Sequence, residues 1–183
     1  MKYSKTVILK DGRECLLRNG EYGDGAAALS VFIRTHEQTD YLLTYPDENT
    51  FTAQDEADFL KQKTESDNEI EIVAVVNGKI VGMGGIECVG NHFKTKHRAQ
   101  FGVSIDKEYW GLGIGRAITK ACIDCARAAG YKQLELDVVA ENKNAISLYN
   151  SEGFTEYGRN PKGFRKKPGG WQELILMRLD LER

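Results

Sequence analysis

The sequence predicts an α/β or α+β fold, with helices on both faces of one mixed sheet. Segments of alternating apolar residues, which are typical of strands, cluster in the middle and at the end of the chain. Segments with apolar residues at helical spacing lie between them, and this order favours a layered helix–sheet–helix sandwich. The chain has 183 residues, of which 41% are hydrophobic, and no repeat or linker interrupts it. We therefore expect a single domain over residues 1–183 with a sizeable core.

Turn and cap residues divide the first half of the chain into elements. Asp11-Gly12 and Asn77-Gly78 are tight-turn signals, and each joins two strands. Asp24 is positioned to cap the first helix. The strands are expected at 6–10, 14–18, 69–76 and 79–88, and the helices at 25–35 and 54–65. Between the helices, residues 36–51 form an irregular segment that is rich in aromatic side chains.

Glycines and caps divide the second half in the same way. Gly130 is placed to end a helix that begins near Arg116, and Asn142 can cap a shorter helix that Gly153 terminates. The strands are expected at 99–105, 133–139, 154–157 and 171–181. Two loops are expected, at 90–97 and at 160–170, and the second is rich in glycine and basic residues.

The charge and the hydropathy of the chain exclude several classes of partner. The formal net charge of -2 gives no reason to expect nucleic acid or an anionic membrane surface. The first ten residues contain too short an apolar run for a secretory signal, and no apolar segment is long enough to span a bilayer. The expectation is a cytoplasmic protein without a nucleic-acid or membrane partner, and a homodimer is left open.

The four cysteines do not predict a metal or redox site. Cys122 and Cys125 form a Cys-x-x-Cys, but Cys15 and Cys88 stand alone and supply no second pair. Apolar residues recur at helical spacing around the pair, so both cysteines fall on one apolar stripe. We expect them to be small buried hydrophobic side chains, and we expect no metal.

The stretch Trp110-Gly-Leu-Gly-Ile-Gly-Arg116 predicts a site for a phosphate-bearing ligand. It follows a strand and opens a helix, an arrangement that presents free backbone N–H groups to an anion at a helix N-terminus. A dinucleotide site requires Gly-x-Gly-x-x-Gly early in a βαβ unit, and a Walker loop ends in Gly-Lys-Ser/Thr. The spacing Gly111-x-Gly113-x-Gly115-Arg116 fits neither pattern.

A second motif downstream accompanies this loop. Asn142-x-x-Ala145-x-x-Leu148-Tyr149-x-x-x-Gly153-Phe154 follows a predicted strand. With Ile105-x-x-x-Tyr109-Trp110-Gly111-x-Gly113-x-Gly115, it closely resembles the GCN5-related N-acetyltransferase (GNAT) family, most specifically over residues 99–154. The resemblance implies a mixed, mostly antiparallel sheet flanked by helices, with splayed central strands, and an enzyme that uses acetyl-CoA as co-substrate.

The resemblance also implies roles for individual residues. Backbone groups of Val103 and Ile105 would pair with the pantetheine arm of acetyl-CoA, Asn142 would hydrogen-bond that arm, and Tyr149 would point at its sulfur as the acid. Each of the last two has a plainer interpretation, Asn142 as a helix cap and Tyr149 as a half-buried aromatic. Trp110 stands where the family usually has arginine or glutamine, so contact there is expected through backbone. The backbone groups expected to hold the pyrophosphate belong to Trp110, Gly111, Leu112, Gly113, Ile114, Gly115 and Arg116.

The general base is the least defined part of the predicted site. Many relatives carry an acidic residue at the position of Gln100, and a glutamine cannot usefully accept a proton. Glu87, on the preceding strand, is the best substitute. Its alternative is a solvated carboxylate at a strand end. Glu141, His97 and His92 are weaker candidates, because nothing in the sequence fixes their direction.

The predicted function is an N-acetyltransferase that moves an acetyl group from acetyl-CoA to a primary amine, on a small molecule or a peptide, by direct transfer. Neither Cys88 nor Ser104 has a recognisable histidine partner for a covalent intermediate. The alternative is a non-catalytic acyl-CoA-binding or sensing module of the same fold; a Rossmann-type nucleotide binder comes third. By resemblance, the segments 41–51 and 157–171 would flank the cofactor mouth. Basic side chains on the second segment are either solvated or bind an adenosine phosphate or an acidic acceptor: Arg159, Lys162, Arg165, Lys166 and Lys167.

Overall fold

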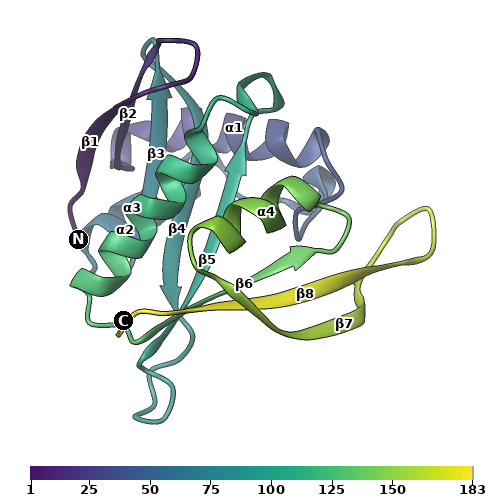
Figure 1. The fold of residues 1–183 in the computed structure, drawn as a ribbon. Helices are drawn as coiled ribbons and strands as arrows, with labels where there is room; N and C mark the ends of the chain where they lie inside the picture. Colours follow the sequence, from purple (N-terminus) through teal and green to yellow (C-terminus); the bar gives the residue numbers. More distant parts are fainter. Residues whose placement is uncertain (183) are drawn as a thin grey trace.

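The protein, described by a computed structural model over residues 1–182, is built on one eight-stranded sheet (Figure 1). The strand order is β1-β2-β3-β4-β5-β6-β8-β7, and every neighbouring pair is antiparallel except β5 and β6. This confirms the predicted mixed, mostly antiparallel sheet. The strands are β1 (Ser4–Ile8), β2 (Glu14–Asn19), β3 (Ile70–Val76), β4 (Lys79–Cys88), β5 (Arg98–Ile105), β6 (Gln133–Val139), β7 (Thr155–Arg165) and β8 (Trp171–Asp180).

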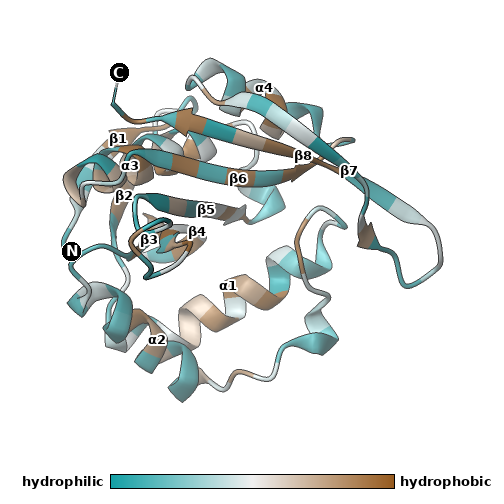
Figure 2. Cartoon of the chain, turned by 90° about the horizontal axis from the view of Figure 1, so that it is seen from below, coloured by the Kyte–Doolittle hydropathy of each residue, from teal (hydrophilic) through white to brown (hydrophobic). Residues whose placement is uncertain are grey.

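Helices cover both faces of the sheet. They are α1 (Gly25–Glu37), α2 (Ala53–Glu65), α3 (Ile114–Ala128) and α4 (Lys143–Ser151). One core cluster joins α1 and α2 to β3 and β4 through Val31, Leu60, Val73 and Met83. A larger cluster joins α3 and α4 to the other face. Figure 2 shows α1 and α2 together on one side of the sheet, with α3 and α4 on the other.

The central strands β5 and β6 separate after a short parallel contact. Their pairing covers Arg98 to Gln100 on β5 and then ends, whereas β5 pairs with β4 along its whole length to Ile105. On its other side, β6 stays paired with β8 along its whole length, from Gln133 to Val139. The two strands therefore splay as the family resemblance implies, and the edge of β5 that faces β6 is open toward the glycine loop.

The alternation of hydrogen-bonded pairs along β5 decides which of its backbone groups point into the splay, the gap between β5 and β6 beyond Gln100. The N–H of Asp106 donates to the Val81 carbonyl at 2.9 Å, so Gly82 and Ile105 form a pair that does not hydrogen-bond. Because such pairs alternate along an antiparallel ladder, the N–H and C=O groups of Val103 and Ile105 point away from β4. They face the open edge, which is the placement expected of the two residues predicted to pair with the pantetheine arm.

Three sequence predictions differ from the structure. Strand β7 continues to Arg165, where a loop was expected from residue 160, because it pairs across two irregular steps with the long strand β8. Helix α3 begins at Ile114 rather than near Arg116, since Gly113 is its N-cap. Asp24 does not cap α1; its carboxylate instead accepts two hydrogen bonds from Arg18 and one from the Glu21 N–H.

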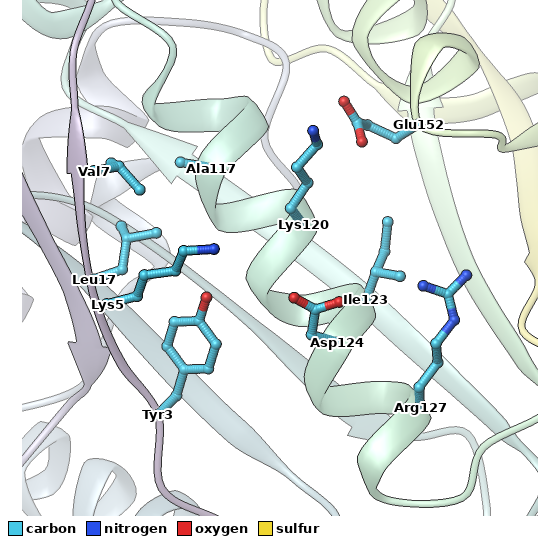
Figure 3. A pocket seen from close by; sticks show the side chains of 10 residues that line it. All are labelled: Tyr3, Lys5, Val7, Leu17, Ala117, Lys120, Ile123, Asp124, Arg127 and Glu152. Carbon is cyan, nitrogen blue, oxygen red and sulfur yellow. The ribbon is translucent and has the colours of Figure 1, made fainter.

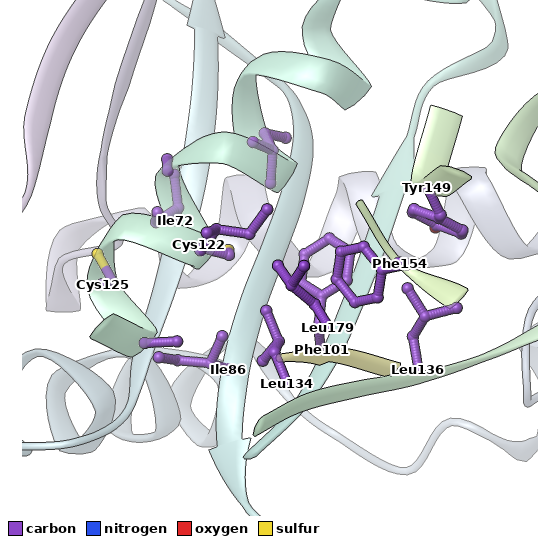
Figure 4. Packing of buried hydrophobic residues seen from close by; sticks show 14 of the residues in the cluster. Ile72, Ile86, Phe101, Cys122, Cys125, Leu134, Leu136, Tyr149, Phe154 and Leu179 are labelled. Carbon is purple, nitrogen blue, oxygen red and sulfur yellow. The ribbon is translucent and has the colours of Figure 1, made fainter. Parts of the chain in front are cut away.

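The core on the α3 side contains the cysteines and the aromatic residues of the second motif (Figure 4). Cys122 and Cys125 are buried on one face of α3, as predicted, and burial raises the pKa of both thiols. Tyr149 and Phe154 pack with Phe101 of β5, at ring-centroid distances of 6.1 and 6.5 Å from the Phe101 ring. This packing fixes α4 beside the splay. Within residues 1–182, no helix combines the length and apolar character needed to cross a membrane.

Candidate active site

The glycine loop between β5 and α3 forms an open cradle of backbone donors. Gly111 and Gly113 have φ angles of +78° and +100°, which a residue with a Cβ rarely adopts, and an added Cβ at either would point into open space. No side chain caps α3. Within residues 1–182, the N–H groups of Ile114, Gly115 and Arg116 donate no hydrogen bond. The cradle therefore offers unpaired donors in the positive field of a 15-residue helix, and these suit a pyrophosphate.

The third glycine has a packing role. An added Cβ at Gly115 would lie 3.3 Å from the Cδ1 of Ile105 and 3.4 Å from the Cδ2 of Leu148. A hydrogen at this position therefore lets the first turn of α3 approach β5 and α4 together. Arg116 extends this contact with a side chain that bonds Glu152 at 3.1 Å and Ser151 at 3.0 Å. Its guanidinium is engaged with α4, so only its backbone N–H is free for the cradle.

Trp110 closes the end of β5 with its side chain. The indole N–H donates to the Ile105 carbonyl at 2.7 Å, and the ring is 43% exposed. The bond occupies one lone pair of that carbonyl at the mouth of the splay. The backbone of Val103 and the N–H of Ile105 are unaffected, so they are the freer contacts for a pantetheine arm.

Asn142 caps α4, as its plainer interpretation predicts. Its Oδ1 accepts a hydrogen bond from the Ala145 N–H at 3.2 Å. Its amide N–H₂ makes no hydrogen bond within residues 1–182, so a donor is left for a ligand. The cap and the ligand contact use different atoms and are compatible.

Tyr149 has a buried ring and an accessible hydroxyl. The residue is 8% exposed, and its hydroxyl makes no hydrogen bond within residues 1–182. Among these residues, no fully buried side-chain oxygen or nitrogen lacks a partner, so the hydroxyl must reach accessible space. Burial raises the pKa of Tyr149 to about 12, which keeps it protonated at neutral pH. The ring packs against Phe101 of β5, the strand that separates from β6 beyond Gln100.

The predicted base candidates do not gather around the splay. Glu87 is in register with Gln100, its side chain is 60% exposed, and its carboxylate forms an ion pair with Lys63 of α2 at 2.9 Å. His92 and His97 are exposed on the loop before β5, at the end of that strand away from the glycine cradle. Glu141 is exposed just before α4. Of the four, Glu87 alone lies on the sheet face that α1 and α2 cover.

A carboxylate that the sequence analysis missed lies closer to the open strand. Glu71 of β3 is in register with Gly85, which is in register with Gly102 of β5. Its side chain extends over Gly85, where an added Cβ would lie 2.2 Å from the Oε2 of Glu71. Nothing lies within 4 Å of an added Cβ at Gly102, so the space beside it is open. An acidic residue in an otherwise apolar central strand was the available sequence signal.

Glu71 is accompanied by a second unpaired carboxylate. Glu56 of α2 is 5% exposed, and neither acid forms an ion pair or a side-chain hydrogen bond within residues 1–182. Burial, and then the charge of Glu56, raise the pKa of Glu71 to about 8, and burial raises the pKa of Glu56. Lys63 opposes this effect on Glu71, but its ammonium binds Glu69 at 2.8 Å and Glu87 at 2.9 Å.

The two segments expected to flank the mouth contact each other. The Lys167 N–H donates to the Tyr45 hydroxyl at 3.1 Å, and the Lys167 ammonium forms an ion pair with Asp47. The Gln172 amide donates to the Asp40 carbonyl at 3.1 Å. Arg159 is paired with Glu156 and Glu173. Two of the five basic residues, Arg159 and Lys167, are therefore neutralised by neighbouring acids rather than free for a phosphate.

A groove of about 300 Å³ lies elsewhere, between β1 and the outer face of α3 (Figure 3). Its lining mixes Lys120 and Arg127 with Asp124 and Glu152, and it includes no residue of the splay. The groove contains neither the glycine cradle nor the open edge of β5. The open edge of β5 and the glycine cradle therefore remain the candidate site.

Glu71→Gln is expected to stabilise the protein at high pH. The folded pKa of Glu71 lies above its ordinary value of 4.5, so its contribution to stability is complete below that value and is lost as pH rises through about 8. Removing the charge should raise Tm by roughly 3 to 8 °C near pH 9 and by little near pH 5. Thermal unfolding over this pH range measures the difference. Glu65→Gln, at a side chain 67% exposed, is the control and should show no such trend.

A family model described as the Acetyltransferase (GNAT) family matches residues 31–154. An uncharacterised N-acetyltransferase of Methanocaldococcus jannaschii is 33% identical over 100 residues, 54% of this chain and 44% of that protein. Human N-acetyltransferase 8B is 34% identical over 89 residues, 48% of this chain and 39% of that protein. The match thus spans less than half the length of these two curated relatives.

Solved structures agree over nearly the whole chain. A GNAT-family acetyltransferase from Streptococcus pneumoniae superposes with a TM-score of 0.87 at 29% identity, covering 91% of this chain and 99% of that one. A putative acetyltransferase from Salmonella typhimurium, solved with its cofactor acetyl-CoA, has a TM-score of 0.81 at 21% identity, covering 91% and 94%, and shows the shared fold. Because the family match includes the glycine cradle and the Asn142–Phe154 motif, the chain belongs to the GNAT acetyltransferase family, whose members use acetyl-CoA.

Proposed function

We propose that the protein transfers an acetyl group from acetyl-CoA directly to a primary amine. The observation that carries this proposal is the splay of β5 from β6, which has an open donor cradle at one end and ionisable groups on both faces. Two relatives are named for N-acylation. The L-amino acid N-acyltransferase MnaT of Escherichia coli is 25% identical over 111 residues, and the bS18-alanine N-acetyltransferase of that species is 33% identical over 81. Both names support an amine acceptor.

The residues around the splay fit acetyl-CoA. In this proposal, the N–H groups of Gly111 to Arg116 bind the pyrophosphate, the backbone edge of Val103 and Ile105 pairs with the pantetheine arm, and the Asn142 amide donates to it. When bound, acetyl-CoA supplies the thioester carbonyl that an amine attacks. The Val103 N–H points into the splay and is placed to donate to the carbonyl oxygen as negative charge develops there.

Tyr149 is proposed to protonate the departing sulfur. Its ring packs against Phe101 of β5, and within residues 1–182 its hydroxyl makes no hydrogen bond, so the proton is available to a ligand. With a pKa of about 12, it is a weak acid for a thiolate whose ordinary pKa is about 8.5. The same dry surroundings that raise the pKa of Tyr149 also make the thiolate more basic, so the two shifts partly cancel.

Glu71 is proposed to receive the proton of the amine, and Glu87 is the alternative candidate for this base. A lysine-like amine costs about 4 kcal/mol to deprotonate near pH 7.4, so a base beside it matters. Glu71 extends over Gly85 toward the open space at Gly102 and has no cation on its carboxylate. Glu87 lies two residues beyond Gly85 on the same face of the sheet, with Lys63 on its carboxylate. A carbon–nitrogen bond forms and the carbon–sulfur bond breaks. The amine gives one proton to Glu71, and the departing sulfur takes one proton from Tyr149.

Gly113→Ala is expected to weaken binding of acetyl-CoA. The Cβ would be strained at a φ of +100° and would lie in the cradle. Acetyl-CoA should raise Tm of the wild type, and NAD should not. The matched control is Gly130→Ala, at a φ of +82° beyond the far end of α3. Both variants should lose roughly 1 to 2 kcal/mol of stability, but only Gly113→Ala should also lose the acetyl-CoA shift. Stabilisation by NAD alone would rule out the transferase.

Tyr149→Phe should lower kcat roughly a hundredfold and leave KM for acetyl-CoA nearly unchanged. The phenyl ring preserves the packing with Phe101 and Phe154 and removes only the proton donor. Tyr157→Phe, at a residue 46% exposed, is the matched control and should have wild-type kcat. Steady-state release of CoA measures both. An unchanged kcat in Tyr149→Phe would remove this residue from the chemistry and favour the non-catalytic acyl-CoA-binding module.

Glu71→Gln and Glu87→Gln separate the two candidate bases. We expect kcat/KM for the amine to fall roughly a hundredfold in Glu71→Gln, because the unpaired carboxylate next to Gly102 is lost. Glu87→Gln should change it less than about threefold, the size of an exposed ion-pair effect. The pH profile of kcat/KM measures both, and the limb near pH 8 should be absent only in Glu71→Gln. The reverse pattern would assign the base to Glu87.

A further inference from the structure

The turn between β1 and β2 contacts the glycine loop, although the two are far apart in the sequence. The Lys10 N–H donates to the Leu112 carbonyl at 3.1 Å. Within residues 1–182, no other hydrogen bond joins the backbone of residues 111–113 to an element other than α3. A second contact lies beside it, since the guanidinium carbon of Arg13 is 5.1 Å from the centroid of the Tyr109 ring. The turn therefore restrains the backbone of the cradle from outside.

Hydrogen bonds within the turn make it stiff. The Gly12 N–H donates to the Leu9 carbonyl at 3.0 Å, and the Leu9 N–H donates to the Arg13 carbonyl at 2.8 Å. The Asp11 carboxylate accepts from the Arg13 N–H at 3.1 Å and from the Arg13 side chain at 2.8 Å. Lys10 and Asp11 have negative φ angles and Gly12 has a φ of +86°, which fits a type I turn followed by a left-handed glycine. Because Leu9 is buried in the larger core, the Lys10 N–H is held in a fixed position.

The bond to Lys10 sets the direction of the next donor in the cradle. The C=O and the N–H of a trans peptide point in opposite directions, and residues 1–182 contain no cis peptide bond. The Leu112 carbonyl points to the turn, so the Gly113 N–H points away from it. The turn belongs to β1 and β2, which lie on the far side of β5 from β6. The Gly113 N–H therefore points toward the side of the splay, and within residues 1–182 it makes no hydrogen bond.

The Leu112–Gly113 peptide needs such a restraint. Glycine adopts positive and negative φ about equally readily, so this peptide can turn over if nothing holds it. A reversed peptide would direct a carbonyl oxygen, rather than a donor, at the pyrophosphate. We propose that the β1–β2 turn is a positioning element for the cofactor, in which the Lys10 N–H holds this peptide with its donor facing the ligand. This inference rests on the proposed function and adds a remote element to its cofactor site.

Lys10→Pro removes this donor with little other change. Lys10 is the second residue of the type I turn, where proline is favoured, and proline has no N–H. We expect the Kd for CoA, measured by calorimetry, to rise roughly tenfold, the effect of losing one hydrogen bond to a charged group. Lys10→Ala is the matched control, because it keeps the N–H and removes the ammonium. Its Kd should stay within about threefold of the wild type, and both variants should keep a Tm close to that of the wild type without ligand.

S-acetylpantetheine distinguishes a displaced cradle from a damaged fold. It carries the thioester and the pantetheine arm but no pyrophosphate, so its kcat/KM should be the same in Lys10→Pro and in the wild type. A matching fall with acetyl-CoA and with S-acetylpantetheine would overturn the inference, as would an unchanged Kd for CoA in folded Lys10→Pro. An equal loss in Lys10→Ala would also overturn it, because the contact would then belong to the ammonium.

Asp11→Ala tests the same turn with an opposite electrostatic expectation. Removing a negative charge near a phosphate site should by itself strengthen binding of CoA. Loss of the hydrogen bonds to Arg13 should instead loosen the turn, so we expect the Kd for CoA to rise at least about threefold. This variant decides the question if Lys10→Pro does not fold, and an unchanged or lower Kd then overturns the inference.

Binding of CoA requires no acceptor, so the inference and the proposed function can fail separately. If no amine were acetylated and these Kd values held, the proposed function would fail while the positioning role of the turn would stand. If amines were acetylated and the Kd for CoA did not respond to the turn, only the positioning role would fail.

Discussion

The pairing of β5 is the constraint on which the site depends. This strand is held by β4 along its whole length and by β6 over only three residues, so half of one edge is left without a partner. An unpaired edge in the middle of a sheet is costly unless other groups satisfy it. The larger core holds the opening in place, since Phe101, Tyr149 and Phe154 pack beside it and Gly115 brings α3 close to β5. The fold thus keeps a rigid gap whose backbone groups are available to a ligand.

In the proposed reaction, the sheet also separates the acid from the base. Successive residues of a strand point to opposite faces, so Phe101 directs the ring contacts of Tyr149 to the α3–α4 side. Gly102 faces α1 and α2, where Glu71 and Glu56 lie. An acid on one face and a base on the other do not neutralise each other. Both can act on a thioester held at the edge between them.

Sequence reasoning found the parts of the site that depend on local geometry. The glycine cradle and the cap of α4 are encoded within a few residues, and the motif around Tyr149 gave the helix that carries it. Glu71 was not singled out because its place beside Gly85 and Gly102 arises only through two strand registers. The cap predicted at Asp24 was wrong because Arg18 of β2 binds that carboxylate. The extension of β7 was missed because its polar residues carry no apolar alternation.

The open space at Gly102 has a consequence for how the family member can vary. A side chain added there would meet no atom within 4 Å, so the folded chain could accommodate it without repacking. In the proposed reaction, its volume would instead be taken from the room left for the acceptor amine. At Gly85, by contrast, any side chain collides with Glu71 and with the Ile70 backbone. One glycine is therefore fixed by its surroundings, while its neighbour across the ladder is free to vary without repacking, and in the proposed reaction that variation would change the room for the acceptor.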